Sequence, residues 1–223
     1  MGSKSALIVG ASGLVGNELL KQLLSAQEYG KVVALVRTSL GIDHPKLEEK
    51  IIDFDNIDFY KECFKVNDVF CCLGTTIKKA KSKEIFKKVD VDYPVAVAKL
   101  AKETQVEKFL IVSSVGANPN SKVFYSRMKG LLEEQLKELG LKSLHIFRPS
   151  LLLGERKEQR LGEDIGKFVT KGILFMFKGT LSHYSPIEAR VLALGIYRIA
   201  QSNAKSGVHV YSYNQISNVT LET

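Results

Sequence analysis

The sequence has few cysteines, no tryptophan and no long apolar run, and these shortages exclude several classes of protein. Its three cysteines, Cys63, Cys71 and Cys72, are odd in number and show no CxxC spacing, which argues against a disulfide framework and predicts buried, reduced thiols in the cytoplasm. The four histidines have no carboxylate cluster beside them, so we expect no metal site. No run reaches the roughly 18 apolar residues of a membrane-spanning helix, and we expect no export signal.

Basic residues outnumber acidic ones, 32 to 24, which gives a net charge of +8. Lysines concentrate between residues 78 and 88, at Lys78, Lys79, Lys81, Lys83, Lys87 and Lys88. A nucleic-acid binder is one interpretation, and it predicts a steep salt dependence of DNA or RNA retention. The segment lacks regularly interleaved aromatic stacking platforms, however, so we interpret it as a solvated helix face and expect no nucleic-acid partner.

Short β-branched runs alternate with longer helical segments along most of the 223 residues. The strand-like runs are SALIVG, KVVALVR, KIIDF, VFCCLG, KFLIVSS, KSLHIF and, late in the chain, GVHVYSY. Helical segments are predicted as well. Two of them begin near Leu14 and near Phe124, and two others cover YPVAVAKLAKE and SPIEARVLALGIYRIAQ. Continuously apolar strands that alternate with helices are typical of a parallel sheet covered on both faces. The sequence therefore predicts one α/β domain over residues 1–223, a doubly wound parallel sheet of the Rossmann type.

Three glycines lie between the first predicted strand and the first predicted helix, in GASGLVG. In such a loop one glycine turns the chain, a second lets the backbone approach a pyrophosphate, and a third lets helix and strand pack closely. Gly10, Gly13 and Gly16 can therefore hold a dinucleotide at the helix N-terminus. The alternative is a glycine turn that binds no ligand.

Three further strand ends meet at the same edge of the predicted sheet, where a dinucleotide crevice belongs. Arg37 ends the second strand, where an NAD site usually has an acidic residue, and a guanidinium there favours the 2′-phosphate of NADP. Asp53 can accept a hydrogen bond from the adenine amino group, and Gly74 lets the chain pass under the adenine and ribose. The alternative for Arg37 is an exposed arginine at a strand end that binds no ligand. The alternative for Asp53 and for Gly74 is an ordinary turn residue.

A YxxxK pattern at Tyr125 and Lys129 places both side chains on one face of a helix. The pattern is expected about once by chance in a chain of this composition, so its position carries the interpretation. It opens the helix after the strand that ends in Ser113 and Ser114. The lysine charge favours the phenolate form of the tyrosine, which can then exchange a proton with a carbonyl oxygen that Ser114 holds. A tyrosine with a solvated lysine is the alternative.

In these motifs the chain resembles the short-chain dehydrogenases/reductases, and more closely their atypical Tat-interactive-protein-like group. The likeness spans roughly residues 6–165 in GASGLVGNELL, VFCCLGTT, VDVDYPVAVAKLAK, FLIVSSVGAN, FYSRMKGLLEEQL and FRPSLLLGERKEQRLGE. The stretches CCLGTT and FRPSLLL are the most specific. The resemblance implies a Rossmann fold that binds NADP in preference to NAD and acts on a small-molecule substrate.

The resemblance also implies a set of site residues. Cofactor phosphates would lie at Ser12, Gly13, Leu14 and Val15, the 2′-phosphate at Arg37, the adenine end at Asp53, the nicotinamide ribose near Gly74 and Thr75, and the nicotinamide beside Pro149 and Ser150. Tyr125 and Lys129 match the catalytic pair. Ser114 matches the catalytic serine better than Ser113 does, because it precedes Val115 and Gly116.

Two positions depart from the family pattern, and both concern catalysis more than cofactor binding. Asp90 stands where many members have an asparagine that helps to relay protons, and the usual NAG after the fourth strand reads Cys72-Leu73-Gly74. The leading hypothesis is an NADP-dependent oxidoreductase that reduces a carbonyl or oxidises an alcohol. Its rival is an NADPH-binding regulatory protein without turnover.

Residues 151–185 are expected to form an insertion on the substrate side. Its apolar run at residues 168–177 is read as core or pocket wall, and its charged residues include Arg156, Lys157 and Arg160. A homodimer through a helix face is common in this type of fold, and the sequence leaves the oligomeric state open.

Overall fold

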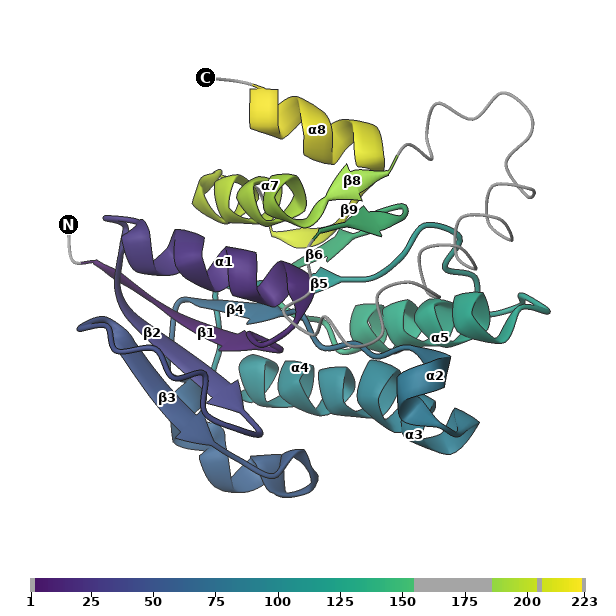
Figure 1. The fold of residues 1–223 in the computed structure, drawn as a ribbon, viewed down its shortest axis with the longest axis horizontal. Helices are drawn as coiled ribbons and strands as arrows, with labels where there is room; N and C mark the ends of the chain where they lie inside the picture. The colour runs from purple at the N-terminus through teal and green to yellow at the C-terminus, as the bar shows by residue number, and fades with distance from the viewer. Residues whose placement is uncertain (1–2, 155–185, 204–205, 222–223) are drawn as a thin grey trace.

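A seven-stranded, wholly parallel sheet forms the centre of the computed structural model, which describes residues 3–154, 186–203 and 206–221 (Figure 1). The strand order is β3-β2-β1-β4-β5-β6-β9. The strands are β1 (Lys4–Val9), β2 (Tyr29–Val36), β3 (Leu47–Ile51), β4 (Asp68–Cys71), β5 (Lys108–Val112), β6 (Ser143–Phe147) and β9 (Gly207–Tyr211). The predicted doubly wound fold is confirmed. Most of the predicted insertion, including residues 168–177, lies outside the described residues.

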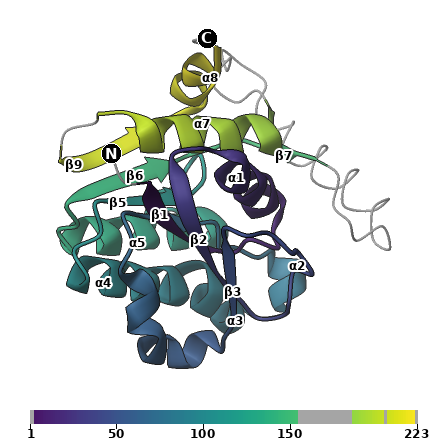
Figure 2. The same ribbon diagram turned by 90° about the vertical axis from the view of Figure 1, so that its left-hand side faces the viewer.

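Helices cover both faces of the sheet, as Figures 1 and 2 show. On one face lie α1 (Leu14–Ser25), α7 (Ala189–Gln201) and α8 (Tyr213–Leu221), and on the other α4 (Tyr93–Glu103) and α5 (Phe124–Glu138). Each face has its own apolar core. Alternate side chains of one strand enter different cores: Leu7 and Val9 pack with α4 and α5, and Ala6 and Ile8 with α1 and α7. This explains why the strands are continuously apolar.

The third strand and the lysine-rich segment differ from their predicted forms. The third strand ends at Ile51, because the Asp53 carboxylate caps the following 3-10 helix η1 (Phe54–Phe64) by accepting from the Asp55 amide at 3.0 Å. The lysine-rich segment is not one helix. It forms α2 (Ile77–Ala80), α3 (Lys83–Lys87) and a π-turn, η2 (Lys88–Asp92). Its six lysines are exposed as predicted, while Phe86 is fully buried.

A two-stranded parallel pair, β7 (Leu152–Leu153) and β8 (Ile187–Glu188), was not predicted and is too short for a periodicity signal. The Ile187 amide donates to the Leu151 carbonyl at 2.9 Å. A Cβ at Gly154 would lie 2.8 Å from Leu14 at the start of α1. The chain therefore leaves and re-enters the described fold beside the carboxyl edge of the sheet.

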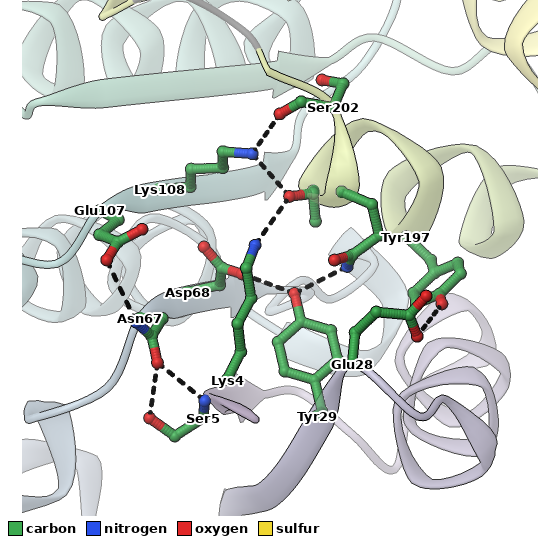
Figure 3. A network of polar contacts seen from close by, with 12 residues as sticks. Lys4, Ser5, Glu28, Tyr29, Asn67, Asp68, Glu107, Lys108, Tyr197 and Ser202 are labelled. Carbon is green, nitrogen blue, oxygen red and sulfur yellow. Dashed lines mark hydrogen bonds and ion pairs between the residues drawn. The ribbon is translucent and has the colours of Figure 1, made fainter. Parts of the chain in front are cut away.

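A polar network fastens the opposite, amino edge of the sheet to the end of α7 (Figure 3). The ammonium groups of Lys4 and Lys108 donate to the Ala200 carbonyl, at 3.4 and 2.6 Å, where positive charge suits a helix C-terminus. Beneath them the buried Asp68 carboxylate accepts from the Tyr29 hydroxyl at 2.6 Å. Burial raises the pKa of Asp68 above its usual range, against the opposing effects of Tyr29 and Lys4. The network lies away from the predicted site and serves the fold.

Candidate functional site

The glycine loop packs so tightly that two of its glycines, Gly10 and Gly16, are needed by the fold itself. Gly10 has a φ of +80°, and a Cβ there would lie 2.5 Å from the carbonyl carbon and oxygen of Cys72. A Cβ on Gly16 would collide with the Gly10 carbonyl oxygen. That oxygen accepts from the Gly13 amide at 3.0 Å. The glycines therefore allow close packing of β1, α1 and the chain after β4 whether or not a ligand is bound.

The first turn of α1 presents backbone N–H groups to the carboxyl edge of the sheet. Gly13 is the N-cap residue and has no side chain to cap the turn, and Ser12 and Gly13 are exposed. The turn continues with Leu14, Val15 and Gly16, and α1 is 12 residues long. Free amides and the positive end of the helix dipole suit an anion such as a phosphate.

A cleft opens between this turn and the ends of β2 and β4. Its lining includes the loop of residues 10–13, Arg37, Phe54, Gly74 and Tyr93. Among the lining residues that the structure describes, Arg37 is the one with a charged side chain. The Phe54 and Tyr93 rings lie 5.4 Å apart and form part of the wall. A glycine floor, an uncapped helix N-terminus and a guanidinium fit a phosphate-bearing dinucleotide, and no carboxylate side chain lies in the described part of the lining.

Asp53 does not line this cleft. Its carboxylate accepts hydrogen bonds from the Asp55 amide and from Asn56 Nδ2, both at 3.0 Å, and so is engaged in the start of η1. The neighbouring Phe54 lines the cleft in its place. Sequence reasoning missed Phe54 and Tyr93, and nothing in the local pattern distinguishes them from core aromatics.

The tyrosine and lysine of the YxxxK pattern lie in the first turns of α5, beyond the cleft lining. Tyr125 is half-buried, and its ring packs edge-on against Phe86 at 5.9 Å. Lys129 is buried and forms an ion pair with Asp90 across 2.8 Å. Burial disfavours the charged form of Lys129, but the Asp90 carboxylate together with Tyr125 and Cys71 more than offsets it, so the pKa of the lysine is raised. Lys129 is therefore held as an ammonium beside Tyr125.

The two candidate serines after β5 have different surroundings. Ser113 is buried, and its hydroxyl donates to Glu133 Oε1 at 2.6 Å. Glu133 in turn accepts from Arg148. Ser114 is half-buried, and its hydroxyl donates to the Val115 carbonyl at 3.2 Å. Ser113 is thus engaged with α5, while the one contact of the Ser114 hydroxyl within the described residues is local and can be replaced by a ligand.

The segment after β6 joins the loop that carries these serines. The Pro149 carbonyl accepts from the Val115 amide at 2.9 Å. Pro149 is buried and Ser150 is half-buried. Thr75, on the loop after β4, donates its amide to Asp90 Oδ2 at 2.8 Å and so reaches the Lys129 ion pair. The structure therefore brings the predicted residues to the carboxyl edge of the sheet in two groups. One group lines the cleft with the glycine loop and Arg37, and the other lies around Tyr125 and Lys129. The chain at residues 72–76 connects the two groups.

Other classes of site find no support in the described part of the chain. No group of three or more histidine, cysteine, aspartate or glutamate side chains there is arranged to hold a metal ion. None of the helices there is long and apolar enough to cross a membrane. The three cysteines are free, and burial raises the pKa of Cys71 to about 12, so this thiol is unreactive near neutral pH.

A doubly wound parallel sheet with a glycine loop and a cleft where the strand order reverses defines a dinucleotide-binding protein. Residues 10–168 match the model of a family described as NAD(P)H-binding. The protein HTATIP2 of Rattus norvegicus is 39% identical over 171 residues, covering 75% of this chain and 70% of the relative. The mitochondrial protein FMP52 of Eremothecium gossypii is 34% identical over 220 residues, covering 95% of each. The chain belongs to the NAD(P)H-binding Rossmann family, in the HTATIP2- and FMP52-like group of atypical short-chain dehydrogenases/reductases.

Solved structures of low sequence identity support the fold. MoeE5 in complex with UDP-glucuronic acid and NAD matches with a TM-score of 0.72 at 17% identity, covering 99% of this chain and 82% of MoeE5. A short-chain dehydrogenase/reductase superfamily protein from Agrobacterium tumefaciens with bound NAD matches with a TM-score of 0.68 at 13% identity, covering 93% and 77%. The predicted family and fold are confirmed, and with them NAD(P)H binding.

Proposed function

We propose that the protein is an NADP-dependent oxidoreductase that transfers a hydride to or from a small carbonyl or alcohol substrate. The observation that carries the proposal is the buried Lys129, ion-paired with Asp90 and about one turn from Tyr125 on α5, at the sheet edge that also carries the cleft and Arg37. A bound dinucleotide would supply or accept the hydride. The protein's own residues must hold the cofactor, orient the substrate and move one proton.

The residues proposed to bind the cofactor contact different parts of the dinucleotide. The backbone amides at Ser12, Gly13, Leu14 and Val15 would hold the phosphates, and the Arg37 guanidinium the 2′-phosphate. Gly74 and Thr75 would lie against the nicotinamide ribose, with Pro149 and Ser150 beside the nicotinamide. Asp53 remains the proposed contact at the adenine end, which requires its carboxylate to leave the Asp55 amide or to bind through a free lone pair.

Tyr125 is the residue that we propose transfers the proton. Its phenol donates to the carbonyl oxygen during reduction, and the Lys129 ammonium stabilises the phenolate that remains. Ser114 would donate a hydrogen bond to the same oxygen. Ser113 is the weaker candidate, because its hydroxyl already donates to Glu133 in a buried contact.

Calorimetric titration with NADPH and NADH tests the choice of cofactor. Arg37→Ala removes the guanidinium from the cleft lining, and charge-assisted hydrogen bonds contribute roughly 1.5–3 kcal/mol each. We expect NADPH affinity to fall about 30-fold or more while NADH affinity changes little. Lys31→Ala is the matched control, because Lys31 lies on β2, the strand that Arg37 follows, and pairs with Glu48. Equal losses for both nucleotides, or none, would contradict NADP selection by Arg37.

A regulatory NADPH-binding protein without turnover is the second candidate, and one observation favours it. The Lys129 charge is already balanced by Asp90 in a buried pair, which weakens its effect on Tyr125. A panel of carbonyl substrates with NADPH, run on the wild type and Tyr125→Phe, separates the two. Turnover that Tyr125→Phe abolishes supports the enzyme, whereas tight NADPH binding with no turnover supports the regulator.

We also propose that the protein works in a reducing compartment, and specifically in the cytoplasm. Three unpaired cysteines, one of them buried, support the first part. Relatives from yeasts carry the word mitochondrial in their names. Fractionation of cells that express the full chain decides between the cytoplasm and the mitochondrion.

A further inference from the structure

Asp90 lies at the point where the two groups of site residues meet. Its side chain is 1% exposed and belongs to the π-turn η2. Oδ1 pairs with the Lys129 ammonium at 2.8 Å, and Oδ2 accepts from the Thr75 amide at 2.8 Å. One carboxylate thus joins α5, η2 and the chain after β4. π-Turns of this kind are frequent at functional sites.

The two donors explain why a carboxylate suits this position better than an asparagine would. Each oxygen of Asp90 serves one donor. An asparagine has one acceptor oxygen, and its NH2 group would face either the Lys129 ammonium or the Thr75 N–H, both of which are donors. An asparagine would also leave the buried Lys129 charge without a counter-ion, which is costly.

We propose that Asp90 is a positioning residue that fixes Lys129 and the chain at residues 72–76 in one mutual arrangement. Lys129 and Thr75 cannot then move independently, because the same carboxylate binds both. The roles of these two residues toward a cofactor rest on the proposed function. The coupling itself rests on the contacts and can be measured without a cofactor.

Hydrogen exchange at the Thr75 amide tests the coupling. In Asp90→Asn, Lys129 and Thr75 compete for one oxygen, and the charged donor wins because ion–dipole attraction exceeds that of a neutral N–H. We expect exchange at Thr75 to rise about tenfold through loss of this hydrogen bond. Asp92→Asn is the matched control: Asp92 lies in the same turn but is exposed and pairs with Lys87, and we expect no change.

A double variant gives the decisive comparison. In Asp90→Asn combined with Lys129→Met, the competing donor is gone and the Asn oxygen is released to the Thr75 amide. We expect slow exchange to return, and the protein to fold, since no unpaired buried charge remains. Equally fast exchange in the single and double variants would overturn the proposal, because Thr75 would then not depend on Lys129. Unchanged exchange in both would overturn it as well.

Titration of the same proteins with NADPH connects the coupling to function. We expect Asp90→Asn to bind NADPH about tenfold more weakly than the wild type and Asp92→Asn, within the usual range of coupling between sites. If the wild type binds no NADPH, the proposed function fails, while the exchange comparison still decides the coupling. If the wild type binds NADPH but exchange does not follow the expected pattern, the positioning role of Asp90 fails and the proposed function stands.

Discussion

The buried Glu133 carboxylate on α5 gives a sharp prediction for stability, because it joins the ends of β5 and β6 to that helix. Glu133 Oε1 accepts from the Ser113 hydroxyl at 2.6 Å and from Arg148 Nε at 2.9 Å, and Oε2 accepts from Arg148 Nη2 at 2.5 Å. The Glu133 side chain is 2% exposed, and that of Arg148 is 34% exposed. In Glu133→Gln, an NH2 group replaces one acceptor and faces a donor.

Breaking a buried ion pair by removing one partner costs about 3–5 kcal/mol, and the partial exposure of Arg148 favours the low end. For a chain of this size, about 3 kcal/mol lowers the melting temperature by roughly 6–12 °C. Thermal and urea unfolding of Glu133→Gln measure the change. The exposed neighbour Glu134→Gln is the matched control and should melt within about 2 °C of the wild type. If the two variants have the same melting temperature, the Glu133 network does not stabilise the contact of α5 with the ends of β5 and β6.

Two further predictions concern the glycine loop and the edge of the sheet at β6 and β9. Gly16→Ala should destabilise the protein by about 3 kcal/mol in urea unfolding, because its Cβ meets the Gly10 carbonyl oxygen. Gly74→Ala, whose Cβ would lie 3.5 Å from Asp90, should cost less than about 1 kcal/mol, and equal costs would refute the packing role of Gly16. Burial, with the nearby His209 and Lys108, lowers the pKa of His145 to about 4 from an ordinary value of 6.5. The unfolded chain therefore binds more protons between these values, so stability should fall by up to about 3 kcal/mol as the pH drops from 6.5 to 4. His145→Gln should flatten this part of the curve, and an unchanged slope would show that His145 does not cause it.

The fold could be predicted from the sequence because its strongest signals are local and repeated. Apolar runs such as residues 32–36 are buried on both faces, and the register pairs them in parallel as the alternation with helices requires. The missed elements have other causes. The β7–β8 pair has two residues in each strand, and η1 depends on one cap from Asp53. Such features are decided by single contacts, which no periodicity reports.

The candidate site was predicted less completely, because sequence places residues along strands but not across them. Arg37, Gly74 and the glycine loop follow strands that the sequence identified, and they do line one cleft. Asp53 follows a strand too, yet its carboxylate caps the next helix. Its neighbour Phe54 lines the cleft and Asp53 does not. Asp90 was recognised as a departure from the family pattern, but its contact with Lys129 depends on how η2 and α5 pack together.

The tight packing of the glycine loop changes what its sequence pattern can mean. A Cβ at Gly10 would press on Cys72, and one at Gly16 on Gly10, so this fold needs both glycines even without a nucleotide. The loop pattern alone therefore cannot separate a dinucleotide site from a bare turn. The features that do so are ones the packing does not require: the uncapped first turn of α1 and the exposed Arg37 at the cleft. Substitutions at Arg37 consequently test ligand binding without the loss of folding that substitutions at the glycines would bring.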